Sequence, residues 1–180
     1  MRPVFSLSLL LMILPTLGFS QTAPPSTTPV SDALRQGLTR SSKNMIAAAD
    51  AMPAEKYSFK PTPEQITFAH LTLHIADSNT RFCSAISGVT APEAPKLAET
   101  DSKDKLVSAL KASFDFCSSS LGKVDDSHLA DSIPLFPNRS FSRAGVMFIL
   151  SGSWADHYSA QSMYLRLNGV LPPTAQPASH

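Results

Sequence analysis

Four polar side chains follow one another at helical spacing in the first half of the chain. His70, His74, Asp77 and Arg81 are separated by four, three and four residues, so in a helix they share one side. Two histidines at positions i and i+4 of a helix can bind one metal ion, because both imidazoles then point the same way. A solvated polar helix face gives the same pattern, so the spacing alone leaves a metal site open.

A second group of polar side chains lies near the C-terminus, around His157. Ser153 precedes this histidine by one helical turn, and Tyr164 follows it by two turns. In a helical bundle, a ligand from this second segment would complete a metal site that His70 and His74 begin.

Four segments with an apolar repeat close to 3.6 residues must position these side chains. In chain order, the predicted helices are residues 31–51, 65–87, 102–122 and 142–169. Ser31 or Asp32 caps the first, Gly88 ends the second, and Ser142 caps the fourth. Helices of this length, about 30 to 40 Å each, pack most simply as an all-α four-helix bundle. Residues 128–142 form the longest irregular stretch between helices and are expected to be a small flap or a short hairpin.

The N-terminus has the order of a secretory signal peptide. A basic residue, Arg2, precedes an apolar run that ends at Leu14, and small residues lead to a cleavage site after Ser20. The run is far shorter than the roughly 20 residues that span a bilayer. We therefore expect export to the periplasm or beyond, and we expect no membrane span. The expected organisation is a signal peptide over 1–20, a Pro/Ser/Thr spacer over 21–29, the bundle over 30–174 and a flexible tail over 175–180.

Composition excludes several classes of protein. With 180 residues, of which 43% are hydrophobic, the chain has material for one core and little room for a second domain. The hydrophobic content is too high for a disordered chain. Lys and Arg number 15 against 14 Asp and Glu, which leaves no basic field for a phosphate backbone. We do not expect nucleic acid to be a partner.

Two segments of the chain resemble the DinB-like proteins, a family named for damage-inducible bacterial members. They are TFAHLTLHIADSNTRFCSAISG and, far downstream, DHYSAQSMYLRLNGVLPP. The similarity extends over about residues 30–174. The resemblance implies a four-helix bundle with a long crossover connection, which often binds a divalent metal through three histidines. It also implies an activity for some members, because certain relatives are thiol S-transferases that use mycothiol or bacillithiol.

The resemblance also assigns the histidines. His74 matches the histidine of the second helix, and His157 matches the second histidine of an HxxxH pair in the fourth. The first member of that pair falls at Ser153, and a hydroxyl is a poorer ligand than imidazole for zinc or nickel. His70 is a candidate for the third imidazole, so the cofactor we expect is zinc, nickel or manganese. In the opposite interpretation the site is degenerate and its histidines are merely packed or hydrogen-bonded.

Other residues of the two segments are candidates for supporting roles. Asp77 or Asp156 could orient a ring nitrogen of a histidine or bind the metal directly. Trp154 could form the wall of a pocket, although ordinary core packing explains it as well. Tyr164 and Arg166 belong to the family motif, and Arg166 suits either a substrate carboxylate or the dipole at a helix C-terminus.

Two functions remain open from the sequence. The first is a divalent-metal-dependent enzyme, either a thiol S-transferase or a hydrolase, with an altered histidine set. The second is a non-catalytic exported bundle that binds a small ligand or a protein through the same site. Export argues mildly against the thiol S-transferase, because the thiols that those relatives use are chiefly cytosolic. A homodimer is compatible with both functions.

The two cysteines, Cys83 and Cys117, are candidates for a disulfide. Disulfides persist in exported proteins, and with two cysteines there is one possible pairing. Both lie near the C-terminal ends of predicted helices, so a bond requires these helices to run roughly parallel. Residues 88–101 are long enough to cross one bundle length, and the crossover of the family agrees with this. Two buried free thiols are the alternative.

Overall fold

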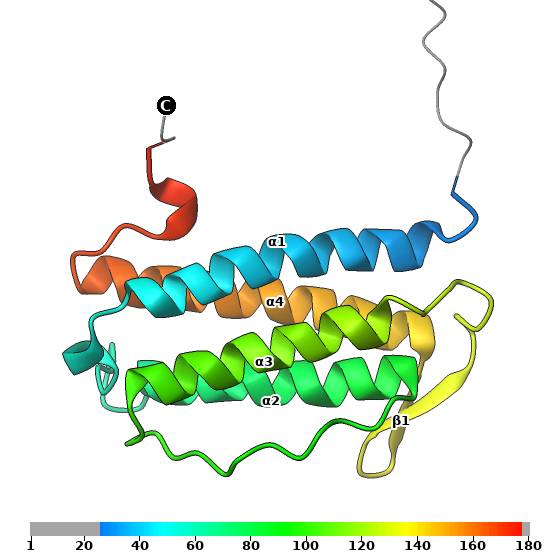
Figure 1. Cartoon of the computed structure of the whole chain (residues 1–180), viewed down its shortest axis with the longest axis horizontal. Coiled ribbons are helices and arrows are strands. Elements are labelled where there is room, and N and C mark those ends of the chain that lie inside the picture. The colour runs from blue at the N-terminus through cyan, green and yellow to red at the C-terminus, as the bar shows by residue number, and fades with distance from the viewer. Residues whose placement is uncertain (1–25, 178–180) are drawn as a thin grey trace, which may run out of the picture.

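The protein is a four-helix bundle, as the computed structural model describes it for residues 26–177 (Figure 1). The helices are α1 (Pro29–Ala51), α2 (Phe68–Ser87), α3 (Lys103–Leu121) and α4 (Arg143–Leu167). Short 3-10 turns, η1 (Ala54–Lys56) and η2 (Pro173–Ala175), follow α1 and α4. The expectation of an all-α bundle is confirmed. The predicted signal peptide, most of the predicted spacer and the last three residues of the predicted tail lie outside the described residues.

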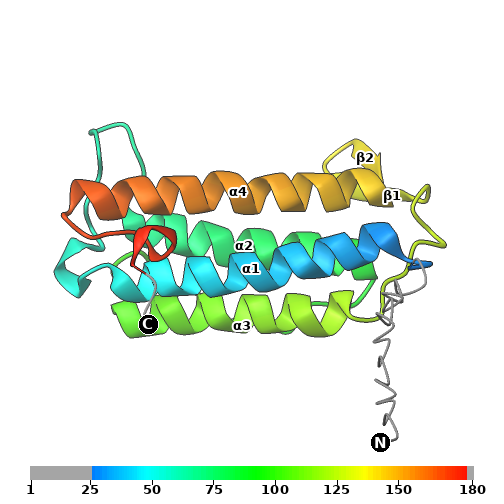
Figure 2. The same cartoon turned by 90° about the horizontal axis from the view of Figure 1, so that it is seen from above.

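The bundle has two layers with a long crossover. α1 and α4 lie in one layer and run in the same direction, while α2 and α3 lie in the other and run in the opposite direction (Figures 1 and 2). Because α2 and α3 are parallel, residues 88–102 must return along the outside of the bundle from the end of α2 to the start of α3 (Figure 1). We call this segment the strap.

Local capping explains where α2 and α4 begin. The prediction placed the start of α2 at Gln65, but Gln65 lies in a turn and the helix begins at Phe68. Its cap is Thr67, whose hydroxyl accepts the backbone N–H of His70 at 2.9 Å. Ser142 caps α4 as predicted, because its hydroxyl accepts the backbone N–H of Gly145 at 3.1 Å.

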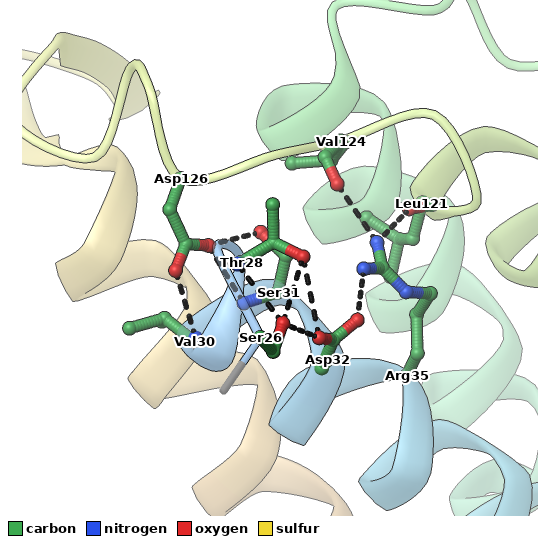
Figure 3. Close-up of polar contacts among 9 residues, drawn as sticks. All are labelled: Ser26, Thr28, Val30, Ser31, Asp32, Arg35, Leu121, Val124 and Asp126. Carbon is green, nitrogen blue, oxygen red and sulfur yellow. Dashed lines mark hydrogen bonds and ion pairs between the residues drawn. The ribbon is translucent and has the colours of Figure 1, made fainter. Parts of the chain in front are cut away.

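The start of α1 is capped by a residue from another part of the chain. The helix begins at Pro29, earlier than the predicted cap at Ser31 or Asp32. The Asp126 carboxylate, from the segment after α3, accepts the backbone N–H groups of Val30 and Ser31, both at 2.9 Å (Figure 3). These N–H groups have no partner within the helix, so the Asp126 carboxylate caps α1 and links it to the segment after α3.

The buried core contains a polar network that joins three helices. Asn79 of α2, Ser113 of α3 and Trp154 of α4 are all nearly inaccessible to solvent. The indole N–H of Trp154 donates to Asn79 Oδ1 at 2.8 Å, and Asn79 Nδ2 donates to Ser113 Oγ at 3.1 Å. Burying polar groups is tolerated when they are paired, so this network sets how the three helices align.

A β-hairpin precedes α4, which is one of the two forms expected for residues 128–142. Strands β1 (Ser132–Phe136) and β2 (Arg139–Ser142) pair antiparallel, and β2 leads directly into α4. Ile133 is buried, and the rings of Phe136 and Phe82 meet edge to face with centroids 6.5 Å apart. The hairpin is thereby packed against α2.

Cys83 and Cys117 form a disulfide, with a Cα–Cα distance of 5.2 Å. The bond joins the C-terminal parts of α2 and α3, which requires their parallel arrangement. Both side chains are fully buried.

None of the described helices combines the length and the apolar character that a membrane crossing would demand.

Candidate functional site

A cleft of about 390 Å³ opens between α2, α4 and the hairpin. It is lined by His74, Ser78, Arg81, Phe82, Phe136, Ile149, Gly152, Ser153, Asp156 and His157. α2 and α4 supply the polar groups at helical spacing, and Phe136 of β1 adds an aromatic ring. The cleft therefore combines several hydrogen-bonding groups with an apolar wall, which is typical of a small-molecule site.

Two histidines from different helices meet in this cleft. The ring centroids of His74 and His157 lie 4.9 Å apart, and the ring planes are nearly perpendicular. Ser153 lies one turn before His157 on α4, and its Oγ is 3.2 Å from His157 Nδ1. The Nε2 of His157 is not used in this contact.

The electrostatics of the cleft favour a neutral imidazole at His157. Burial lowers the pKa of His157, and the neighbouring His74 lowers it further, while Asp156 opposes the change. Near neutral pH this ring therefore offers one hydrogen-bond donor and one acceptor and carries no charge. The permanent positive charge of the cleft is the guanidinium of Arg81.

The third candidate ligand, His70, is hydrogen-bonded outside the cleft. Its Nδ1 lies 2.7 Å from Glu99 Oε1, close to the end of the strap. Thr67 donates to the same carboxylate, and these two hydrogen bonds hold the pKa of Glu99 below its ordinary value. The structure does not bring His70 to the other two histidines, because it ties this side chain to the strap.

The other candidates separate into different parts of the molecule. Asp156 lines the cleft, but Asp77 faces a second cavity on the other side of α2. Trp154 is in the core, where its indole N–H donates a hydrogen bond to Asn79, and it forms no part of the cleft. Arg166 is exposed in the last turn of α4, where it suits the helix dipole.

Tyr164 has a structural position at the far end of α4. Its hydroxyl donates to the carbonyl of Ile66 at 2.7 Å, and its ring packs against Phe59 and Phe68. Burial raises the pKa of this phenol. Tyr164 thus holds the loop between α1 and α2 against α4.

Several cleft residues were not singled out from the sequence as site residues. Ser78 and Phe82 lie one and two turns after His74, so helical spacing carried a signal for them. Phe136 gave none, because its position depends on how the hairpin packs against α2. Ile149 lies in an apolar run of the fourth helix, so nothing in the sequence separated it from the core residues around it.

The family of this bundle follows from a comparison of the chain with family models. The model of the DinB superfamily matches residues 38–159, which span most of α1, all of α2 and α3, and most of α4. The chain belongs to the DinB superfamily. The resemblance found in the two sequence segments is thereby confirmed.

Solved structures of DinB-like proteins share the fold of this superfamily member. One from Bacillus cereus ATCC 10987 superposes with a TM-score of 0.65 at 14% identity, covering 79% of this chain and 95% of the other. One from Bacillus subtilis gives a TM-score of 0.65 at 17% identity, covering 82% and 99%. A comparison with curated proteins gives no match. At these identities the likeness concerns the fold alone.

The residues present do not fit the three-histidine metal site that the resemblance implies. His74 and His157 supply two imidazoles, and Ser153 occupies the third position, where its hydroxyl contacts His157 Nδ1. Within residues 26–177, no group of three or more His, Cys, Asp or Glu side chains is arranged to hold a metal ion. The donor set in the cleft is suited to hydrogen bonding more than to a closed metal centre.

Proposed function

We propose that this DinB-superfamily protein binds a small organic anion with an apolar body in the cleft between α2 and α4. The observation that carries the proposal is the meeting of His74 and His157 in a 390 Å³ cleft that also contains a guanidinium. Two imidazoles, at least one of them neutral, recognise an oxygen-bearing ligand by hydrogen bonds. The Arg81 guanidinium supplies the charge for a carboxylate or a similar anion.

The apolar part of the ligand is argued from the apolar side chains of the same cleft. Phe82, Phe136 and Ile149 line the cleft beside these polar groups. An aromatic or branched ligand body would be removed from water against these side chains. Asp156 in the same cleft disfavours a ligand with negative charge at both ends.

Benzoate is a suitable probe, because it joins one aromatic ring to one carboxylate. We expect it to shift the ring resonances of His74 and His157 in an NMR titration of the mature protein. Arg81→Gln should weaken this binding, and His157→Ala should weaken it as well. His70→Ala is the matched control, since His70 lies on the same helix but bonds to Glu99. Equal binding by the Arg81→Gln variant and the unchanged protein would contradict the proposal.

A second candidate is a divalent-metal-dependent enzyme of the thiol S-transferase or hydrolase type. The close approach of His74 and His157 favours it, since two imidazoles on facing helices can share one zinc, nickel or manganese ion. Metal analysis after supplementation with each ion tests it. Stoichiometric metal that is lost in His74→Ala supports the enzyme, and metal-free protein under all three conditions supports the binding protein.

We also propose that the protein is exported to the periplasm or beyond. The signal-peptide pattern of residues 1–20 supports this, and so does a disulfide, because such bonds persist in oxidising compartments. N-terminal sequencing of the protein from a cell fraction is the test. A mature chain that starts at Gln21 agrees with export, and a cytosolic chain that keeps residues 1–20 contradicts it.

A further inference from the structure

A second and larger cavity lies under the strap, on the other side of α2 from the histidines. Its volume is about 620 Å³, and its walls are α2, α3 and residues 92–97 of the strap. This size is within the range of small-molecule sites, about 300–1,000 Å³. The strap runs alongside both helices (Figure 1). The cavity lining extends over about two turns of each helix, from Leu73 to Thr80 and from Ala109 to Phe116, so the cavity is elongated along the helices.

Small side chains under the strap leave this space open. Ala76 of α2 and Ala109 and Ala112 of α3 line the cavity where larger residues would fill it. Leu73 and Phe116 supply larger apolar surface. An apolar ligand would remove this surface from water, which is the main source of affinity in such a site.

The strap is fastened at its two ends and free of hydrogen bonds between them. At one end Ser84 Oγ donates to the carbonyl of Val89 at 2.6 Å, and at the other Glu99 accepts from Thr67 and pairs with His70. Residues 90–97, all of them in the described part of the chain, make no hydrogen bond. Two prolines in this stretch, at 92 and 95, have no N–H to donate.

The strap is also longer than its path requires. The disulfide holds the C-terminal parts of α2 and α3 together, so the strap must cover about the length of α3. α3 has 19 residues, which corresponds to about 28 Å. The strap, residues 88–102, has an extended reach of about 50 Å. It can therefore move outward to admit a ligand while both helices stay in place.

The charges around the cavity select the end group of the ligand. Asp77 and Glu93 contribute two carboxylates to its lining, and Lys96 contributes one ammonium group. The lining thus has an excess of negative charge beside a mainly apolar surface. We propose that the strap cavity binds an elongated apolar molecule with a basic amine at one end. The amine pairs with these carboxylates, and the apolar chain lies between the helices and the strap.

Octylamine is the probe for this site, because it combines one amine with a short and soluble alkyl chain. In calorimetric titrations of the mature, disulfide-bonded protein, we expect saturable 1:1 binding with a negative heat-capacity change. Backbone amide resonances of the strap should shift in NMR spectra. Octanoate, with the same chain and the opposite charge, should bind at least tenfold more weakly. Equal affinity for the two would overturn the assignment of an amine.

Two matched variants test the location. Ala112→Leu fills the cavity and should lower the affinity for octylamine at least tenfold. Ser108→Leu places the same side chain on an exposed position of α3 outside the cavity and should leave the affinity unchanged. Both substitutions put a good helix former on an exposed helix position, so the melting temperature should be nearly unchanged. Undiminished binding by Ala112→Leu would refute the site.

A third variant separates this cavity from the histidine cleft. His157→Ala should leave octylamine binding unchanged, since His157 lies in the other cleft. Loss of octylamine binding in this variant would refute the strap cavity. Failure of benzoate to bind would contradict the function proposed for the histidine cleft and leave the strap cavity standing.

Discussion

Breaking the disulfide between Cys83 and Cys117 should cost a large fraction of the stability of the fold. The bond closes a ring across a sequence separation of 34 residues, which includes the whole strap. In the chain-entropy model, a ring of this length stabilises the folded state by about 4 kcal/mol. For a chain of this size we expect the melting temperature to fall by roughly 8–15 °C.

The assay compares three samples by thermal and urea unfolding. They are the oxidised protein, the same protein after reduction, and the double variant Cys83→Ala/Cys117→Ala. Both sulfurs are fully buried, so the protein must be reduced in denaturant and refolded with reductant present. The reduced protein keeps both side chains and loses only the bond, whereas the double variant also loses two buried sulfurs. The double variant should therefore be the least stable and should not respond to reductant.

Alkylation after denaturation checks the oxidation state of the two cysteines in each sample. The unreduced protein should accept no alkyl group, and the reduced protein should accept two. Two alkylated thiols in unreduced exported protein, or equal melting temperatures with and without reductant, would refute the reasoning.

The remaining predictions concern the cleft, the core and the helix caps. Ser153→His restores the third imidazole of the family beside His157, so the zinc affinity measured in a competition titration should rise at least tenfold. An unchanged zinc affinity would show that the helices cannot present a third ligand. Asn79→Leu leaves the buried indole N–H of Trp154 without an acceptor, so urea unfolding should give a free energy of unfolding lower by about 1–3 kcal/mol. An unchanged free energy of unfolding would mean that the network contributes nothing to stability. The pKa of His157 is lowered in the fold, so the contribution of this residue to stability is present above the ordinary histidine pKa of about 6.5 and is lost as the pH falls below that value. An NMR titration that gives this ring an ordinary or raised pKa would contradict the argument. Asp126→Ala should speed hydrogen exchange at the first amides of α1 and leave the exchange rates in the middle of the helix as they are. Exchange at the first amides that is as slow as in the unsubstituted protein would show that the cap is dispensable.

The helices and their order were predictable because their signals are local. The apolar repeat places each helix, and Gly88, with a φ of 72°, ends α2 where only glycine adopts this conformation without strain. The cap at Ser142 was also predictable, since its partner lies three residues away. Such signals depend on residues that are close in the sequence.

The cap of α1 was not predictable on the same grounds. Asp126 lies about 95 residues from the amides that it accepts, and no local pattern connects them. The same limit applies to Trp154, because only the packing of three helices shows that its indole meets Asn79. Long-range partners of this kind are decided when the elements pack.

The candidate site divides in the same way. The sequence alone determined that His74 and His157 lie on two helices of a bundle with a serine at the third position, since spacing and family resemblance are properties of the chain. Only the tertiary structure decided that their rings meet at 4.9 Å, while His70 turns to the strap and pairs with Glu99. The physical reason is that one helical turn separates His70 from His74, which sets the side of the helix but not the partner. The partner depends on where the strap passes, and the packing of α2 against α3 determines that path.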